Sequence, residues 1–141
     1  MNASRRASAN GLYVGLISGT SMDGVDAVLV RIEDGGIQHL GALMHPYPEE
    51  LRRDLHRTIL PQARLDLATF SRLHVEVGAS FAEAVGALLT RTGTSASQIA
   101  AIGSHGQTVY HAPLGAHPYT LQIGNPATIA ARSGVVTVAD F

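Results

Sequence analysis

The segment GTSMDGVD at residues 19–26 combines residue types that can bind an anion. Its two glycines permit a tight turn that brings backbone N–H groups close to such an anion. Thr20 and Ser21 add hydroxyl donors. Asp23 could hold a magnesium ion, directly or through water, as phosphate sites usually arrange it. An ordinary polar hairpin turn explains the same residues equally well, so both interpretations stay open from this segment alone.

A second segment, SHGQTVYH at residues 104–111, offers side chains for sugar binding or proton transfer. The pattern predicts a strand over 99–103 that opens into a loop at 104–107, and open α/β sheets bind ligands where strands end. His105 and Gln107 could contact a sugar or move a proton, with purely structural hydrogen bonds as the alternative. A metal shared by His105 and His111 is not expected, because six residues of one strand separate them by about 20 Å.

A third segment, QIGNP at residues 122–126, predicts a strand that runs directly into a helix. Asn125 is a favoured N-cap residue and Pro126 suits the first helical position. The N-terminus of a helix attracts anions, although simple capping accounts for the same two residues.

Hydrophobic patterning supplies the elements that must position these segments. In chain order, the sequence predicts strands at 12–18, 25–32 and 37–47, helices at 49–60 and 66–92, a capping serine at Ser97, strands at 99–103 and 120–123, a helix at 126–132 that ends at Gly134, and a strand at 135–141. One face of the long helix carries its apolar residues at steps of three or four, namely Phe70, Leu73, Val77, Phe81, Ala84 and Leu88. This order predicts an α/β fold, with three antiparallel strands followed by helical crossovers to parallel strands.

The composition excludes several classes of function. The 141 residues are enough for one domain, and 45% hydrophobic with 15% charged residues is typical of a folded chain. A net charge of −1 gives no electrostatic surface for nucleic acid or an anionic membrane. All ten basic residues are arginines, which rules out a Walker P-loop lysine, and the absence of cysteine rules out disulfides and thiolate chemistry. No apolar run is long enough to span a membrane, so we expect a cytoplasmic protein with a disordered N-terminus at 1–11.

Four stretches together, LISGTSMDGVDAVLV, IGSHGQTVYH, LQIGNPATIAARSG and VVTVADF, resemble the anhydro-N-acetylmuramic acid kinases of bacterial peptidoglycan recycling. The stretches occur in the family's order and cover nearly the whole chain. The resemblance implies a ribonuclease H-like lobe of the actin-like ATPase fold. Residues 12–141 would then be the N-terminal lobe of a two-lobe sugar kinase.

The resemblance also implies a reaction and its participants. The family uses ATP and water to open the 1,6-anhydro bridge of anhydro-N-acetylmuramic acid and to phosphorylate O6, which gives N-acetylmuramic acid 6-phosphate and ADP. Asp23 would handle Mg²⁺, and the full-length protein could form a homodimer. The residues implied to contact the ATP phosphates are Gly19, Thr20, Ser21, Met22, Asp23, Gly24, Val25 and Asp26. Those implied to contact the sugar are His105, Gly106 and Gln107.

The sequence departs from the family pattern at its end. Family members continue after VADF with FRxxD, a glycine-rich segment and a second lobe that holds the adenosine site. The implied general base is the aspartate of that missing motif, and Asp140 is a weaker candidate for the same role. We therefore expect the 141 residues to be inactive alone. A non-catalytic phosphate- or sugar-binding module, such as a degenerate paralogue, and the product of a decayed gene are the alternatives.

Overall fold

A computed structural model describes residues 10–141 of the chain. The predicted disordered N-terminus lies outside the described residues except at its last two positions. Of these, Gly11 is already part of the first strand.

The chain begins with three antiparallel strands, β1 (Gly11–Ser18), β2 (Gly24–Glu33) and β3 (Gly36–Pro46). The register pairs Ile17 with Asp26 across β1 and β2, so the turn at residues 19–23 joins directly opposed strand ends. The predicted three-stranded start is therefore confirmed, with ends that differ by at most one residue.

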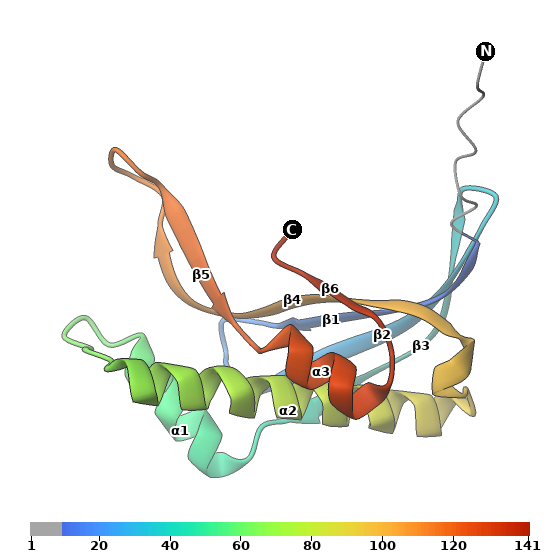
Figure 1. The fold of residues 1–141 in the computed structure, drawn as a ribbon, viewed down its shortest axis with the longest axis horizontal. Helices are drawn as coiled ribbons and strands as arrows, with labels where there is room; N and C mark the ends of the chain where they lie inside the picture. The colour runs from blue at the N-terminus through green and yellow to red at the C-terminus, as the bar shows by residue number, and fades with distance from the viewer. Residues whose placement is uncertain (1–9) are drawn as a thin grey trace.

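The remaining strands extend the sheet beyond β1. They are β4 (Ile99–Ala112), β5 (Tyr119–Ile123) and β6 (Thr137–Ala139). The sheet order is β3-β2-β1-β4-β5, and β6 also pairs with β4 (Figure 1). Strands β1 and β6 run parallel to β4, whereas β5 is antiparallel to it. The mixed α/β class and the parallel crossovers are as predicted.

The helices are α1 (Glu49–Thr58), α2 (Leu67–Thr92), the short 3₁₀ helix η1 (Ala96–Gln98) and α3 (Pro126–Ser133). They lie on one side of the sheet (Figure 1). The Asn125 carboxamide oxygen caps α3 by accepting the N–H of Ala127 at 2.9 Å, as predicted. The predicted cap at Ser97 is wrong, because Ser95 caps η1 in a reciprocal pair with Gln98.

Two strand predictions are wrong. The segment 104–107 is not a loop: β4 continues through it, because it keeps β1 as a partner as far as Gln107 and gains β5 from that residue onward. Gly106, with φ of 79°, absorbs the irregularity inside the strand. The last strand occupies only Thr137–Ala139 of the predicted 135–141, since its pairing with β4 ends there.

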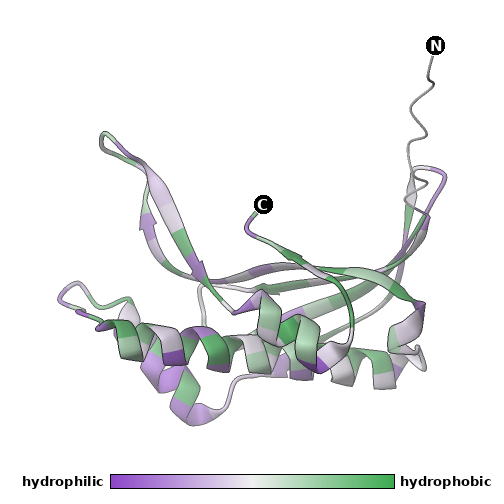
Figure 2. Cartoon of the chain, in the orientation of Figure 1, coloured by the Kyte–Doolittle hydropathy of each residue, from purple (hydrophilic) through white to green (hydrophobic). Residues whose placement is uncertain are grey.

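The core lies between the sheet and α2. Alternate residues of β1 and β2 face the helix and are buried with the predicted apolar face of α2, of which only Phe70 is half-buried. Figure 2 shows hydrophobic residues along the central strands and α2, and hydrophilic residues over α1. Gly78 lets α2 approach the start of α3 closely, since a Cβ there would lie 2.8 Å from the carbonyl oxygen of Asn125, the N-cap residue of α3. No helix among residues 10–141 has the length and apolarity needed to cross a membrane.

Candidate functional site

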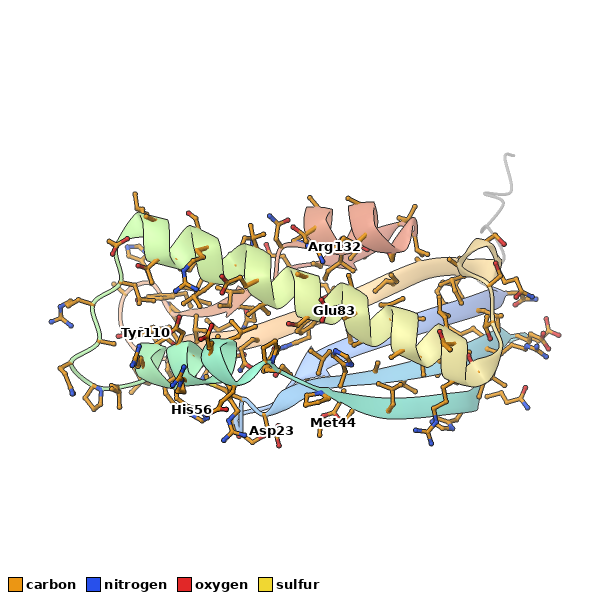
Figure 3. All side chains as sticks on the ribbon, turned by 90° about the horizontal axis from the view of Figure 1, so that it is seen from below. Asp23, Met44, His56, Glu83, Tyr110 and Arg132 are labelled. Carbon is orange, nitrogen blue, oxygen red and sulfur yellow. The ribbon has the colours of Figure 1, made fainter. Side chains whose placement is uncertain are left out.

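The turn between β1 and β2 presents its polar side chains outward. Thr20, Ser21 and Asp23 are exposed, and Figure 3 shows Asp23 at the rim of the molecule. Met22 is buried instead and adopts a left-handed φ of 52°. Its N–H donates to the carbonyl oxygen of Gly19 at 3.2 Å, which closes the turn. Met22 therefore anchors the turn from inside, while its neighbours remain accessible to an anion.

The other three predicted phosphate contacts belong to β2. Gly24 and Val25 are buried, so only their backbone could serve a ligand. Asp26 is exposed on the sheet face opposite α2, where it lines a cavity of about 670 Å³ with Ile17 and His105.

Asp23 carries a carboxylate suited to a hard cation. The Ser21 hydroxyl donates to Asp23 Oδ1 at 2.7 Å. This bond, together with backbone N–H groups and the charge of Arg52, holds the pKa of Asp23 below its ordinary value. Among residues 10–141, no three carboxylate or imidazole side chains gather as a metal cage. One carboxylate nevertheless fits Mg²⁺, which usually keeps waters and completes its coordination with phosphate oxygens.

Gln107 connects β4 to this turn from the buried side. Its Oε1 accepts from the Ser18 hydroxyl at 2.6 Å, and its Nε2 donates to the carbonyl oxygen of Gly19 at 3.2 Å. The Ser18 hydroxyl also lies 2.7 Å from the carbonyl oxygen of Gly24. Gln107 has no exposed surface, so its predicted contact with sugar is not visible in this chain. The sequence prediction missed Ser18, whose signal is a polar residue on the inward side of an alternating strand.

A fork in the sheet lies beside the turn. One edge of β4 pairs with β6 over residues 102–104 and with β5 from Gln107 onward. His105 and Gly106 lie between these two pairings and line a cavity of about 420 Å³, which we call the fork pocket. Gly106 is required there, because φ is 79° and a Cβ would lie 2.6 Å from the carbonyl oxygen of Ile123.

Asp140 enters the fork pocket from the end of β6. The parallel register pairs Ser104 with Ala139, so Asp140 follows at the level of His105. Its φ of 61° is in the left-handed region, which aspartate tolerates better than most residues. Ser104 is buried, and its hydroxyl has no hydrogen-bond partner among the described residues. The structure thus brings together two of the three predicted sugar contacts and the predicted catalytic carboxylate.

His74 of α2, which the sequence did not single out, positions the far wall of the fork pocket. Its Nδ1 accepts from the N–H of Gly124 at 3.1 Å, and its backbone oxygen accepts from the N–H of Asn125 at 2.9 Å. The imidazole also stacks on Phe70, with ring centroids 6.1 Å apart. Because Nδ1 must be unprotonated to accept, this geometry requires a neutral ring.

Burial lowers the pKa of His74 from its ordinary 6.5, which predicts a pH-dependent stability. The unfolded chain binds a proton at His74 more readily than the folded one, so the free energy of unfolding should fall as pH decreases below 6.5 toward the lowered value. Urea unfolding of the full-length gene product across this range should show a flatter dependence for His74→Asn, which keeps an acceptor and does not titrate. The exposed His56→Gln variant should retain the wild-type slope, and equal slopes for all three would contradict the prediction.

These features define a class. The three-stranded antiparallel start, the parallel crossovers and the polar turn at the end of β1 are the architecture of an actin-like ATPase lobe. Comparison with known proteins gives the family: the sequence model of anhydro-N-acetylmuramic acid kinase matches residues 11–141. The chain belongs to the anhydro-N-acetylmuramic acid kinase family.

Curated relatives support this assignment. The anhydro-N-acetylmuramic acid kinase of Vibrio cholerae serotype O1 is 45% identical over 92% of this chain and 35% of its own length. Those of Saccharophagus degradans and Photobacterium profundum are each 46% identical over 92% of this chain, and over 36% and 34% of their own lengths. The chain thus spans about a third of the length of the relatives it matches.

Proposed function

We propose that the full-length gene product containing this sequence is an ATP-dependent kinase for 1,6-anhydro-N-acetylmuramic acid. One observation carries the proposal. The parallel register of β1, β4 and β6 puts the 19–23 turn, the fork pocket and Asp140 at one edge of the sheet. Residues 12–141 are then its N-terminal lobe, and the remaining two thirds of a family-length chain supply the second lobe. In this proposal the reaction is a step of peptidoglycan recycling and takes place in the cytoplasm, where ATP is available. The full-length protein is proposed to form a homodimer.

In this proposal the turn binds the ATP phosphates. Thr20 is exposed at the end of β1, so its hydroxyl and the backbone N–H groups of the turn can donate to phosphate oxygens. The hydroxyl proton of Ser21 goes to Asp23, so Ser21 would contribute its backbone N–H. Asp23, held ionised by Ser21, would hold Mg²⁺, which neutralises charge on the phosphates when it is bound. Asp26, three residues after Asp23, adds a second exposed carboxylate next to the turn.

The fork pocket binds the sugar in the same proposal. His105 is exposed and can hydrogen-bond hydroxyl groups, and Gly106 lines the pocket where β4 passes close to Ile123. Water adds to C1 as the 1,6-anhydro bond breaks, O6 is released and forms a bond to the γ-phosphorus, and ADP leaves. A base must take a proton from the water. The family pattern assigns this base to an aspartate that follows VADF, and within the described residues Asp140 is the carboxylate that lines the pocket.

A coupled ADP-release assay tests the proposal. The full-length gene product is supplied with ATP and Mg²⁺, with and without the anhydro sugar. ADP release that requires the anhydro sugar supports the kinase. A folded protein that binds ATP without any turnover would contradict it and favour the non-catalytic binding module.

A further inference from the structure

We propose that Gln107 and Ser18 are positioning residues that hold the 19–23 turn in its phosphate-binding form. The inference rests on the proposed function, which assigns phosphate to this turn. It adds a buried pair that touches neither ATP nor sugar and acts through the backbone of the turn.

The pair fixes both ends of the turn. Gln107 Nε2 donates to the carbonyl oxygen of Gly19, the first turn residue, at 3.2 Å. The Ser18 hydroxyl lies 2.7 Å from the carbonyl oxygen of Gly24, the residue that ends the turn. The Ser18 hydroxyl lies 2.6 Å from Gln107 Oε1, so its single proton is shared between Gln107 and the Gly24 carbonyl oxygen in this connection beneath the turn.

The connection orients the N–H group of Thr20. The peptide bonds of the described residues include no cis bond, and the carbonyl and N–H of one trans peptide unit point in opposite directions. The hydrogen bond to Gln107 holds the Gly19 carbonyl toward the buried side, so the Thr20 N–H points toward the exposed side. Thr20 itself is exposed on that side. The same carbonyl accepts from the N–H of Met22 at 3.2 Å, and two donors polarise this peptide unit. A polarised N–H is a stronger donor to a phosphate oxygen.

The hydrogen bonds that the side-chain amide of Gln107 makes with the described residues all lie within the buried interior. The side chain has no exposed surface, and its Nε2 also donates to the carbonyl oxygen of Thr108 at 3.1 Å. A buried amide is unfavourable unless its groups are hydrogen-bonded, so an apolar residue would fill the same space at lower cost. Tyr47, the titratable group close to Ser18, stays protonated because burial raises its pKa.

The test compares variants of the full-length gene product. Gln107→Met keeps the volume and removes the donor, so kcat/KM for ATP should fall about 10- to 100-fold while the KM for the sugar is unchanged. Gln98→Met is the matched control, because Gln98 accepts the N–H of Ser95 at 2.8 Å in η1 and does not touch the turn. Rates are divided by the folded fraction, measured by circular dichroism, so that a loss of stability alone does not change them.

Gln107→Glu should give a pH dependence of kcat/KM that would not arise if Gln107 only filled space. An ionised carboxylate repels the carbonyl oxygens of Gly19 and Thr108, whereas a protonated one can donate to Gly19. The ratio of variant to wild-type kcat/KM should therefore rise as pH falls, while Gln107→Met shows no such rise.

The outcomes separate this inference from the kinase proposal. Normal kcat/KM for ATP in Gln107→Met, with active wild-type protein, would overturn the positioning role and leave the kinase intact. If the wild-type protein binds ATP without turnover, the kinase proposal fails, and ATP affinity decides the inference: weakened binding in Gln107→Met supports it and equal binding overturns it. A wild-type protein that binds no ATP would overturn both.

Discussion

Replacing Asp23 by alanine in the full-length gene product should lower kcat by about 10²–10³-fold, the loss typical of a group that stabilises developing charge. Asp23 is exposed and ionised, and apart from Ser21 no side-chain hydrogen bond to it is seen among the described residues. Its removal should therefore leave the fold unchanged. The assay is steady-state ADP release at increasing Mg²⁺, and the variant should need more Mg²⁺ to reach its lower maximum.

The matched control for Asp23 is Glu50→Gln on α1. Glu50 is another exposed acid, and its ion pair with Arg53 is long at 3.9 Å, so the control should keep wild-type kcat and Mg²⁺ dependence. Turnover close to wild type in Asp23→Ala would remove the Mg²⁺ role from this residue. Equal losses in both variants would indicate a general effect of surface charge.

Gly24→Ala should destabilise the full-length protein by about 3 kcal/mol or more, because overpacking against backbone cannot relax through a side-chain rotation. A Cβ at this position would lie 2.4 Å from the carbonyl oxygen of His45 and 2.9 Å from Cα of Pro46. Gly24 pairs with Pro46 in the register of β2 and β3, so relief requires the two strands to separate where the turn ends. The measurement is urea unfolding followed by circular dichroism.

Gly19→Ala is the control from the same turn. A Cβ at Gly19 would meet no atom within 4 Å, so this variant should unfold at the wild-type urea concentration. Wild-type stability in Gly24→Ala would show that β3 can move away from the turn. Destabilisation of both variants would point to the loss of glycine flexibility rather than to a steric clash.

Local signals explain why most elements could be predicted. The first three strands alternate or end at glycine turns, and the long helix has an apolar face that matches its buried side. Asn125 and Gly134 bound α3 as expected, since capping depends on a few neighbouring residues. Ser95 and Ser97 are both capping residues by type, and only the geometry of η1 selects Ser95.

The long course of β4 could not be predicted from its own residues. Ser104, His105 and Gly106 have the composition of a loop, and they form a strand because β1 lies alongside. This is a tertiary effect, since the pairing partner is about ninety positions away in the sequence. The fork pocket has the same origin, because it depends on two partners that share one edge of β4.

Positioning residues were missed for a related reason. Ser18 and His74 act through hydrogen bonds to segments distant in sequence. The signal of Ser18 is only its polar side chain on the inward side of β1, and nothing in the neighbours of His74 marks it. Asp23 and His105 were identified because their residue types suit the chemistry directly, and Asp140 because it lies near the aspartate that the family pattern implies. Their roles stay predictions, while their placement at one edge of the sheet supports them.

The fork has a consequence for which part of the chain can change in length. The hairpin of β4 and β5 pairs from Gln107 outward, whereas the β1–β4–β6 ladder is set at residues 102–104 and earlier. Insertions or deletions at the hairpin tip, residues 113–118, can therefore change the length of this hairpin without shifting the register that holds Asp140. The fold thus separates the register that holds Asp140 from the β4–β5 hairpin, so this hairpin can change in length without rebuilding the turn at residues 19–23.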